Sequence, residues 1–210
     1  YVDDTAKSGV EYTYRVKMRP VYCDNYGDYD YVTYMFLSTP KIKKITPRPT
    51  GLRLYWNEIA GAEKYEIKYY NTETEKWITL KTVSSDTLAF TDTTVQYGEK
   101  RTYAVWAING NYKSSYSKKT YTYLEEPKIS SLKSTSSGIQ LKFPASEGAT
   151  GYMVYYKIKG TDKWIGLGPS SAMKVKDGVV TYTHKKVTKG KTYYYKAKAL
   201  SGSCESTCDA

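Results

Sequence analysis

Hydrophobic and polar residues alternate with a period of two in short runs along the whole chain. The clearest runs are Leu52–Trp56, Tyr65–Tyr69 and Tyr103–Ala107, and residues that favour turns separate them. Such alternation predicts strands with one buried and one exposed face. No segment keeps its apolar residues at helical spacing, so we predict an all-β protein.

The same phrases recur along the chain, which indicates internal repeats. The spacing between matched residues is 87 positions and then 92, because the later copy carries five extra residues between Trp164 and Tyr182. We expect this insertion to lie in a loop. A period of this length is that of a whole small domain. The matched pairs are Pro40 with Pro127, Gly51–Trp56 with Gly138–Phe143, Gly61–Tyr70 with Gly148–Lys157, and Gly98 with Gly190.

The first repeat is incomplete. Tyr1–Gly9 aligns without gaps on Phe90–Gly98 and on Tyr182–Gly190, so residue 1 falls more than halfway through a repeat. A remnant of about three strands buries too little surface to close a core. We expect either missing residues to complete it or its open edge to pair with another chain. The expected organisation is the C-terminal part of a repeat at 1–39, a complete domain at 40–126, and a domain with a short or truncated last strand at 127–210.

Seven or so short strands in fewer than 90 residues predict an antiparallel sandwich with hairpin and Greek-key connections. In the two later copies a proline opens the first strand, and a large aromatic residue closes the second (Trp56, Phe143). The third strand then reads Gly-Ala-x-x-Tyr-x-(Ile or Val)-x-Tyr, a tryptophan follows, and a glycine phrase opens the sixth strand. In this order, the motifs resemble the fibronectin type III family, in the form common on secreted and cell-surface proteins of Gram-positive bacteria. The resemblance covers nearly the whole chain and implies tandem immunoglobulin-like (fibronectin type III) β-sandwiches.

The resemblance also implies a structural role for the tyrosine three residues after the glycine of that last phrase. In the family this residue forms the tyrosine corner, in which the hydroxyl bonds a nearby backbone group. By position the role falls to Tyr12 and Tyr193, whereas the middle copy has Arg101. We expect the stem of Arg101 to cover the same surface with its charged head in water. We therefore expect this copy to be held less tightly at this end.

For function, the resemblance implies non-catalytic spacer or interaction modules of a larger extracellular protein, either secreted or attached to the cell wall. The other domains of the parent chain would then be partners. A second hypothesis, of a different class, is an adhesin or carbohydrate-binding module that uses tyrosine-rich loops.

The net charge of +11 attracts anionic partners without specifying a fold. The basic residues are spread through the predicted strands, and no nucleic-acid-binding motif accompanies them, so we expect no nucleic-acid partner. A glycan, a cell-wall polymer or a host surface protein is the expected partner. The chain also lacks an apolar run of about 20 residues, so we expect no membrane span in this segment.

The cysteines and the single histidine offer little chemistry. Cys204 and Cys208 are close enough in sequence to bridge across a hairpin, with Cys23 left free, although small buried or surface thiols would explain them equally well. No Cys-x-x-Cys pair accompanies His184, so we expect no metal site. His184 aligns with Asp3 and Asp92, which favours a turn or capping position over a catalytic one. Since no acid–base pair or phosphate-binding loop is evident either, we expect no cofactor and no enzymatic activity.

Two aromatic features remain as candidate ligand sites. The loop Pro20–Tyr31 is rich in tyrosine and aspartate, and such loops supply rigid contact area or attract Ca²⁺. The alternative is that its tyrosines continue the seventh strand while Asp and Gly form the turn. Trp77 and Trp164 could stack on sugar rings, but their identical placement in two copies favours a shared packing role. The candidate ligand residues of the loop are Tyr22, Tyr26, Tyr29 and Tyr31.

Overall fold

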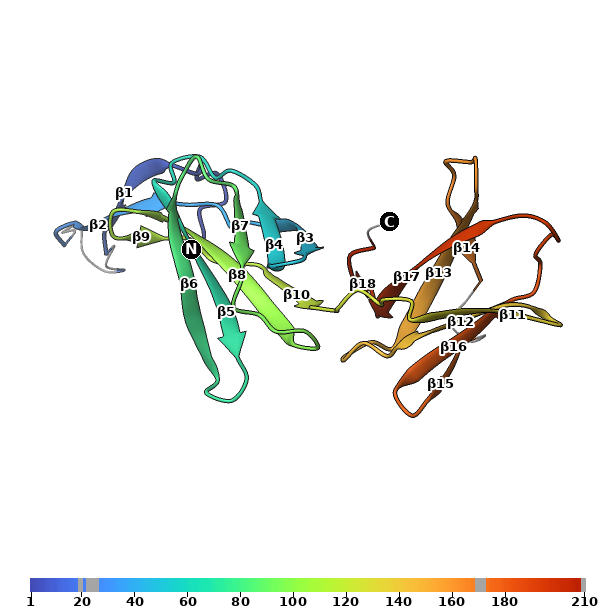
Figure 1. The fold of residues 1–210 in the computed structure, drawn as a ribbon. Coiled ribbons are helices and arrows are strands. Elements are labelled where there is room, and N and C mark those ends of the chain that lie inside the picture. Colours follow the sequence, from blue (N-terminus) through green and yellow to red (C-terminus); the bar gives the residue numbers. More distant parts are fainter. Residues whose placement is uncertain (19–20, 22–26, 169–172, 209–210) are drawn as a thin grey trace. The chain divides into compact units, whose positions relative to one another are not determined.

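The computed structural model describes residues 1–18, 21, 27–168 and 173–208 (Figure 1). In this described part the regular structure is entirely strands, and no helix occurs. By backbone proximity the chain divides into two compact units. The first contains Tyr1–Lys44, Leu54–Phe90 and Thr102–Lys119, and the second contains Ile45–Arg53, Thr91–Arg101 and Thr120–Ala210.

The chain begins with a hairpin of two antiparallel strands, β1 (Val10–Val16) and β2 (Asp30–Phe36). Tyr12 lies opposite Tyr34 in this pairing. Residues 1–9 form turns instead of the third strand expected for this repeat. The Asp3 side chain stabilises one of these turns, because its Oδ1 accepts hydrogen bonds from the backbone N–H (3.0 Å) and the hydroxyl (2.6 Å) of Thr5.

The next repeat contains two sheets. In one the strand order is β3-β4-β7, and in the other it is β10-β8-β5-β6, with the short β9 paired to β8. Trp56 of β4 contacts Tyr65 of β5 with ring centroids 5.7 Å apart, so these two strands face each other across the core. The strands are β3 (Ile42–Arg48), β4 (Gly51–Trp56), β5 (Lys64–Asn71), β6 (Lys76–Ser84), β7 (Ala89–Asp92), β8 (Lys100–Asn109), β9 (Tyr112–Lys113) and β10 (Lys118–Thr122).

The last repeat has the same plan, with sheets ordered β11-β12-β16-β15 and β14-β13-β17-β18 (Figure 1). Its core lies between these sheets and includes Phe143 of β12, Val154 of β13 and Val180 of β16, all fully buried. The segment with the five extra residues includes β15, which adds an edge strand to the first of these sheets. The strands are β11 (Ser131–Thr135), β12 (Gly138–Pro144), β13 (Gly151–Ile158), β14 (Ile165–Leu167), β15 (Lys174–Lys176), β16 (Val179–His184), β17 (Tyr193–Ser201) and β18 (Cys204–Glu205).

The strand order confirms the predicted fold class. In both later repeats the first, second and fifth main strands share one sheet, and the third, fourth, sixth and seventh share the other. This is an immunoglobulin-like sandwich of the fibronectin type III kind. The predicted alternation is also confirmed, since Leu52, Leu54 and Trp56 are buried along β4.

Candidate binding surfaces and the turns before the sixth strands

The sixth strand is β1 in the first repeat and β17 in the last. Near the start of each, a tyrosine hydroxyl bonds the backbone. Tyr12 accepts a hydrogen bond from the backbone N–H of Lys7 at 2.9 Å. Tyr193 accepts the equivalent bond from Thr188 at 2.7 Å. In each case the hydroxyl spans the turn that precedes the strand. The resemblance to the family implies this bond, and we propose the tyrosine-corner role for both residues.

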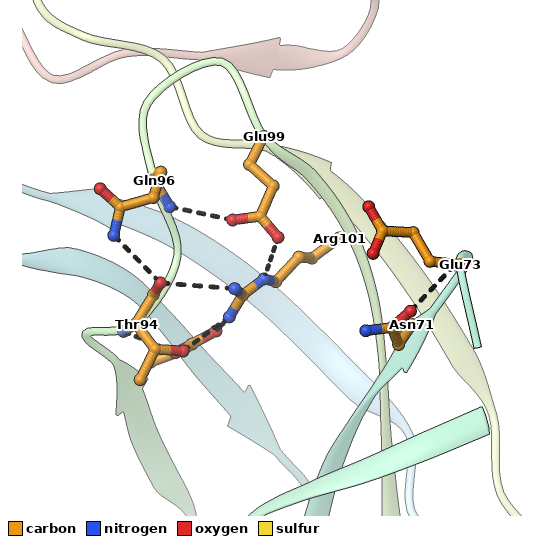
Figure 2. Close-up of polar contacts among 7 residues, drawn as sticks. Asn71, Glu73, Thr94, Gln96, Glu99 and Arg101 are labelled. Atoms are coloured by element: carbon orange, nitrogen blue, oxygen red, sulfur yellow. Dashed lines mark hydrogen bonds and ion pairs between the residues drawn. The ribbon is translucent and has the colours of Figure 1, made fainter. Parts of the chain in front are cut away.

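In the middle repeat, Arg101 occupies this place and is only 8% exposed (Figure 2). Its Nη1 donates to Oδ2 of Asp92 and to Oγ1 of Thr94, both at 2.7 Å. Its Nε donates to the carboxylate of Glu99, which also accepts the backbone N–H of Gln96. The expectation that the charged head lies in water is therefore wrong, because a buried carboxylate supplies a partner for it. We name Arg101, Asp92, Thr94 and Glu99 the arginine clasp.

Electrostatics favour the charged form of Arg101 within the clasp. Burial by itself lowers the pKa of the guanidinium, but the hydrogen bond to Glu99 and the charge of Asp92 raise it by more. The net pKa is raised, so Arg101 stays protonated. Asp92 is fully buried and caps its own turn, since its Oδ1 accepts the backbone N–H and the hydroxyl of Thr94 at 2.9 and 2.8 Å.

Asp3, Asp92 and His184 occupy equivalent positions, but they are not equivalent chemically. The two aspartates cap turns, as predicted from the sequence. His184 is buried like Asp92, with 2% exposure, but its Nδ1 lies 2.9 Å from the hydroxyl of Tyr195. Burial lowers the pKa of His184, although a hydrogen bond involving the Lys186 backbone opposes this. A neutral histidine enclosed by tyrosines is suited to packing.

The tyrosine-rich loop is described only in part. Tyr22 and Tyr26 lie outside the described residues. Tyr29 and Tyr31 are 55% and 70% exposed, and Tyr31 belongs to β2, opposite Arg15. Arg15 and Lys17 place their charged groups 5.2 and 4.8 Å from the centre of the Tyr29 ring. These side chains form a basic and aromatic surface at one end of the hairpin.

A calcium site in that loop has no support from the described residues. Within residues 1–18, 21, 27–168 and 173–208, no group of three or more His, Cys, Asp or Glu residues is placed to hold a metal ion. The same part of the chain contains no helix that is long and apolar enough to cross a membrane.

Trp77 lies in an aromatic cluster on the outer side of the sheet that contains β5 and β8. Its ring meets those of Tyr70, Trp106 and Tyr116 edge-on, with centroid distances of 5.2 to 5.4 Å. Edge-to-face contacts of this kind stabilise aromatic pairs beyond the area that they bury. Trp77 therefore has the packing role that we expected.

Trp164 has different neighbours, so the expectation of a shared packing role is wrong for this residue. No other aromatic ring of the described residues packs against its indole. Lys157 and Lys196 lie over the ring instead, with their Nζ atoms 5.3 and 4.6 Å from its centre. The two tryptophans match in sequence position, but they differ in chemical surroundings.

The candidate disulfide is not formed in the structure. Cys204 is a buried free thiol whose sulfur lies 3.3 Å from the backbone nitrogen of Thr122. Cys204 pairs with Ser201 in the register of β17 and β18, whereas the carbonyl of Cys208 accepts a hydrogen bond from Lys196. The chain thus runs alongside β17 between the two cysteines instead of folding back. Two Cα atoms more than about 7 Å apart cannot be bridged without backbone movement. Cys23 lies outside the described residues.

Comparison with known proteins adds likeness in fold only. No protein-family model matches the sequence, and no curated protein matches it. Among solved structures, a segment of two fibronectin type III domains from chicken tenascin is 18% identical with a TM-score of 0.40, over 82% of this chain and 95% of that one. The chicken interferon gamma receptor alpha chain is 12% identical with a TM-score of 0.39, over the same shares of the two chains. Because these values are low, the fold assignment rests on the strand order described above.

Proposed function

We propose that this chain consists of non-catalytic spacer and interaction modules of a larger extracellular surface protein, of the kind found on Gram-positive bacteria. The modules would be the partial repeat 1–39, the complete domain 40–126 and the domain 127–210. The motif resemblance supports the extracellular and bacterial parts of this proposal. The spacing role is supported by the structure of the junctions between repeats.

A close backbone contact joins the first repeat to the second, and it carries the proposal. A Cβ atom added to Gly61 would lie 2.1 Å from the Cα of Gly9, so the two backbones touch with no room for a side chain. Both glycines have positive φ, of 80° and 81°. The hydroxyl of Ser8 donates to the carbonyl of Ala60 at 2.9 Å, and it accepts the backbone N–H of Ser38. This contact lies within the first compact unit and opposes hinge motion there.

The next junction, inside the second compact unit, is also closed by hydrogen bonds. The hydroxyl of Tyr121 donates to the carbonyl of Glu205 at 2.8 Å and accepts the backbone N–H of the same residue. Thr207 donates its hydroxyl to the carboxylate of Glu126 at 2.7 Å. Pro40 and Pro127 also stiffen the short connections that lead into each repeat. Within each compact unit, these contacts oppose hinge motion at the junction that they close.

Nuclear spin relaxation of the backbone amides tests the spacing role. Amides of the β1–β2 hairpin and of β5 should share one rotational correlation time in the native chain. Gly61→Ala should separate the two times, because the new methyl group pushes Gly9 away. Gly160→Ala is the matched control, since Gly160 also has positive φ (89°) but faces open space. Independent tumbling of the hairpin in the native chain would rule out a rigid spacer at this junction.

The surface around Tyr29 favours a second candidate function, that of an adhesin or carbohydrate-binding module. Two half-exposed or exposed tyrosines next to Arg15 and Lys17 suit a ligand with both apolar and anionic parts. Glycan arrays and binding to host matrix proteins test it with the native chain and with Tyr29→Ala and Tyr31→Ala. Binding lost in both variants would support adhesion. Unchanged binding, or none, would leave spacing as the function of this hairpin.

A further inference from the structure

A groove of about 640 Å³ lies on the last repeat, and Trp164, Tyr194, Lys157 and Lys159 form part of its wall. Lys196 lies beside the groove, with its Nζ 4.6 Å from the centre of the Trp164 ring. The pairing of β13 with β17 explains why they converge. Lys157 lies opposite Tyr194, and Lys196 lies opposite Tyr155, so both lysines point to the outer face of the sheet. Trp164, which directly precedes β14, completes the wall.

The two lysines over the Trp164 ring have no ion-pair partner in the described part of the chain. Over the described part of the chain, no carboxylate lies within ion-pair distance of Lys157 or Lys196. On the corresponding face of the middle repeat, the lysines have a carboxylate partner, because Glu66 pairs with both Lys68 and Lys113. The last repeat therefore presents ammonium groups without a carboxylate partner where the middle repeat pairs its lysines with Glu66.

The aromatic and polar groups limit what can occupy the groove. The faces of Trp164 and Tyr194 offer a flat apolar surface, with ammonium groups 4.6 to 5.8 Å from the ring centres. Thr161 and Asp162 also line the groove, and they can accept hydrogen bonds from hydroxyl groups. A ligand that matches the groove has a flat ring, several hydroxyls and an anionic group.

We propose that this groove binds an acidic carbohydrate, with carboxylates or phosphates on Lys157 and Lys196 and a sugar ring against Trp164. Its hydroxyls would bond Asp162 and Thr161. A nucleic-acid strand or an acidic peptide fits less well, because neither offers as many hydroxyl donors for Asp162 and Thr161. This site goes beyond the spacing role and does not depend on it.

Titration calorimetry on the full chain tests the proposal with two acidic probes. One is an oligomer of galacturonic acid, which carries carboxylates, and the other is a maltooligosaccharide that carries phosphate monoesters. We expect at least one to bind, more weakly as salt is added. The two neutral parents, the methyl-esterified galacturonate oligomer and the unphosphorylated maltooligosaccharide, should bind about tenfold more weakly or worse. The probe that binds identifies whether carboxylate or phosphate is the preferred anion.

Paired variants locate the binding. The double variant Lys157→Met, Lys196→Met keeps the aliphatic stems and should weaken binding by about tenfold or more. Trp164→Ala should weaken it as well, and Lys68→Met, in the middle repeat, should leave it unchanged. Circular dichroism checks the fold of each variant, and the lysine pair decides the result if Trp164→Ala does not fold.

Three outcomes would overturn the proposal. In the first, neither acidic probe binds at millimolar concentration. In the second, the lysine double variant binds as well as the native chain. In the third, polyglutamate or oligothymidylate binds the groove more tightly than either acidic oligosaccharide. That result would assign the groove to a peptide or a nucleic acid. Loss of rigidity at the Gly9–Gly61 contact would not affect any of these measurements.

Discussion

The arginine clasp allows a quantitative prediction about the stability of the middle repeat. Arg101→Met keeps an unbranched apolar stem and removes the guanidinium. Asp92, with no exposed surface, then loses its cation but keeps the bonds from the N–H and hydroxyl of Thr94. The variant thus isolates the free energy of a buried carboxylate that has lost its ion pair.

The expected loss of unfolding free energy follows from the burial of Asp92. Removing one partner of a buried ion pair costs about 3–5 kcal/mol, because the remaining charge is left uncompensated. The two bonds from Thr94 still solvate Asp92 in part, which places the loss near the lower end, at about 3 kcal/mol. Glu99 adds little, since its side chain is 34% exposed and water can replace the guanidinium. For a domain of this size, such a loss lowers the melting temperature by about 12–24 °C.

Tryptophan fluorescence during urea unfolding measures this loss. Trp56, Trp77 and Trp106 belong to the middle repeat, so the signal reports on that repeat alone once Trp164→Phe is introduced as the common background. Lys100→Met is the matched control, because Lys100 precedes Arg101 on the same strand and is exposed. The control should stay within about 0.5 kcal/mol of the background protein.

A double-mutant cycle separates the ion pair from the effects of packing. Asp92→Asn removes the charge from the other partner, and the double variant removes both. If the buried pair is the cause, the double variant loses less stability than the two single losses combined, with a coupling of about 1 kcal/mol or more. An additive cycle, or an Arg101→Met protein within about 0.5 kcal/mol of the background, would refute the reasoning and return Arg101 to the role of a replaceable apolar stem.

Two further predictions concern the equivalent positions in the other repeats. Tyr12→Phe and Tyr193→Phe should each cost about 0.5–1.5 kcal/mol, and the amides of Lys7 and Thr188 should then exchange faster with solvent, as hydrogen exchange would detect. His184 has a lowered pKa when folded, so the unfolded chain binds more protons below its ordinary value of 6.5. The contribution of His184 to stability is therefore complete above that pH and is lost as the pH falls below it. Thermal unfolding followed through Trp164 should show this loss as the pH falls below about 6.5, and His184→Asn should remove it. An unchanged pH dependence in that variant would contradict the assignment.

The strands and their buried faces could be predicted from the sequence because period two is a local signal that recurs in each copy. Along β4, Leu52, Leu54 and Trp56 alternate with the exposed Arg53 and the half-buried Tyr55, and all three are buried. Along β8 the alternation is lost, because Ala104 and Trp106 are buried as well as Tyr103, Val105 and Ala107. Aligning the copies adds information that no single copy carries, since the match of Asp3 with Asp92 correctly indicated a turn-capping position.

The partners of individual side chains could not be predicted in the same way, because they depend on which neighbours the fold brings together. Nothing local to Arg101 indicates that the carboxylate of Asp92, nine positions earlier, is buried beside it. For Trp164, by contrast, the sequence contained a sign that its surroundings differ from those of Trp77. Trp106, which packs on Trp77, is replaced in the last repeat by Lys198, so the aromatic cluster cannot form again.

The three equivalent residues Asp3, Asp92 and His184 have different hydrogen-bonding partners. The degree to which each side chain is buried determines which partner it needs. Asp3 is only partly buried, and neutral donors suffice: the hydroxyls of Thr5 and Tyr14 bond it and lower its pKa. Asp92 has no exposed surface, so a cation offsets the cost of desolvating its charge. His184 is nearly as deeply buried but can shed its charge, and uncharged partners suffice for a neutral imidazole, namely the hydroxyl of Tyr195 and the Lys186 backbone. Since a buried carboxylate with no cation nearby is costly, we infer that a tyrosine in place of Arg101 is compatible with this fold only where the residue equivalent to Asp92 is exposed or can become neutral.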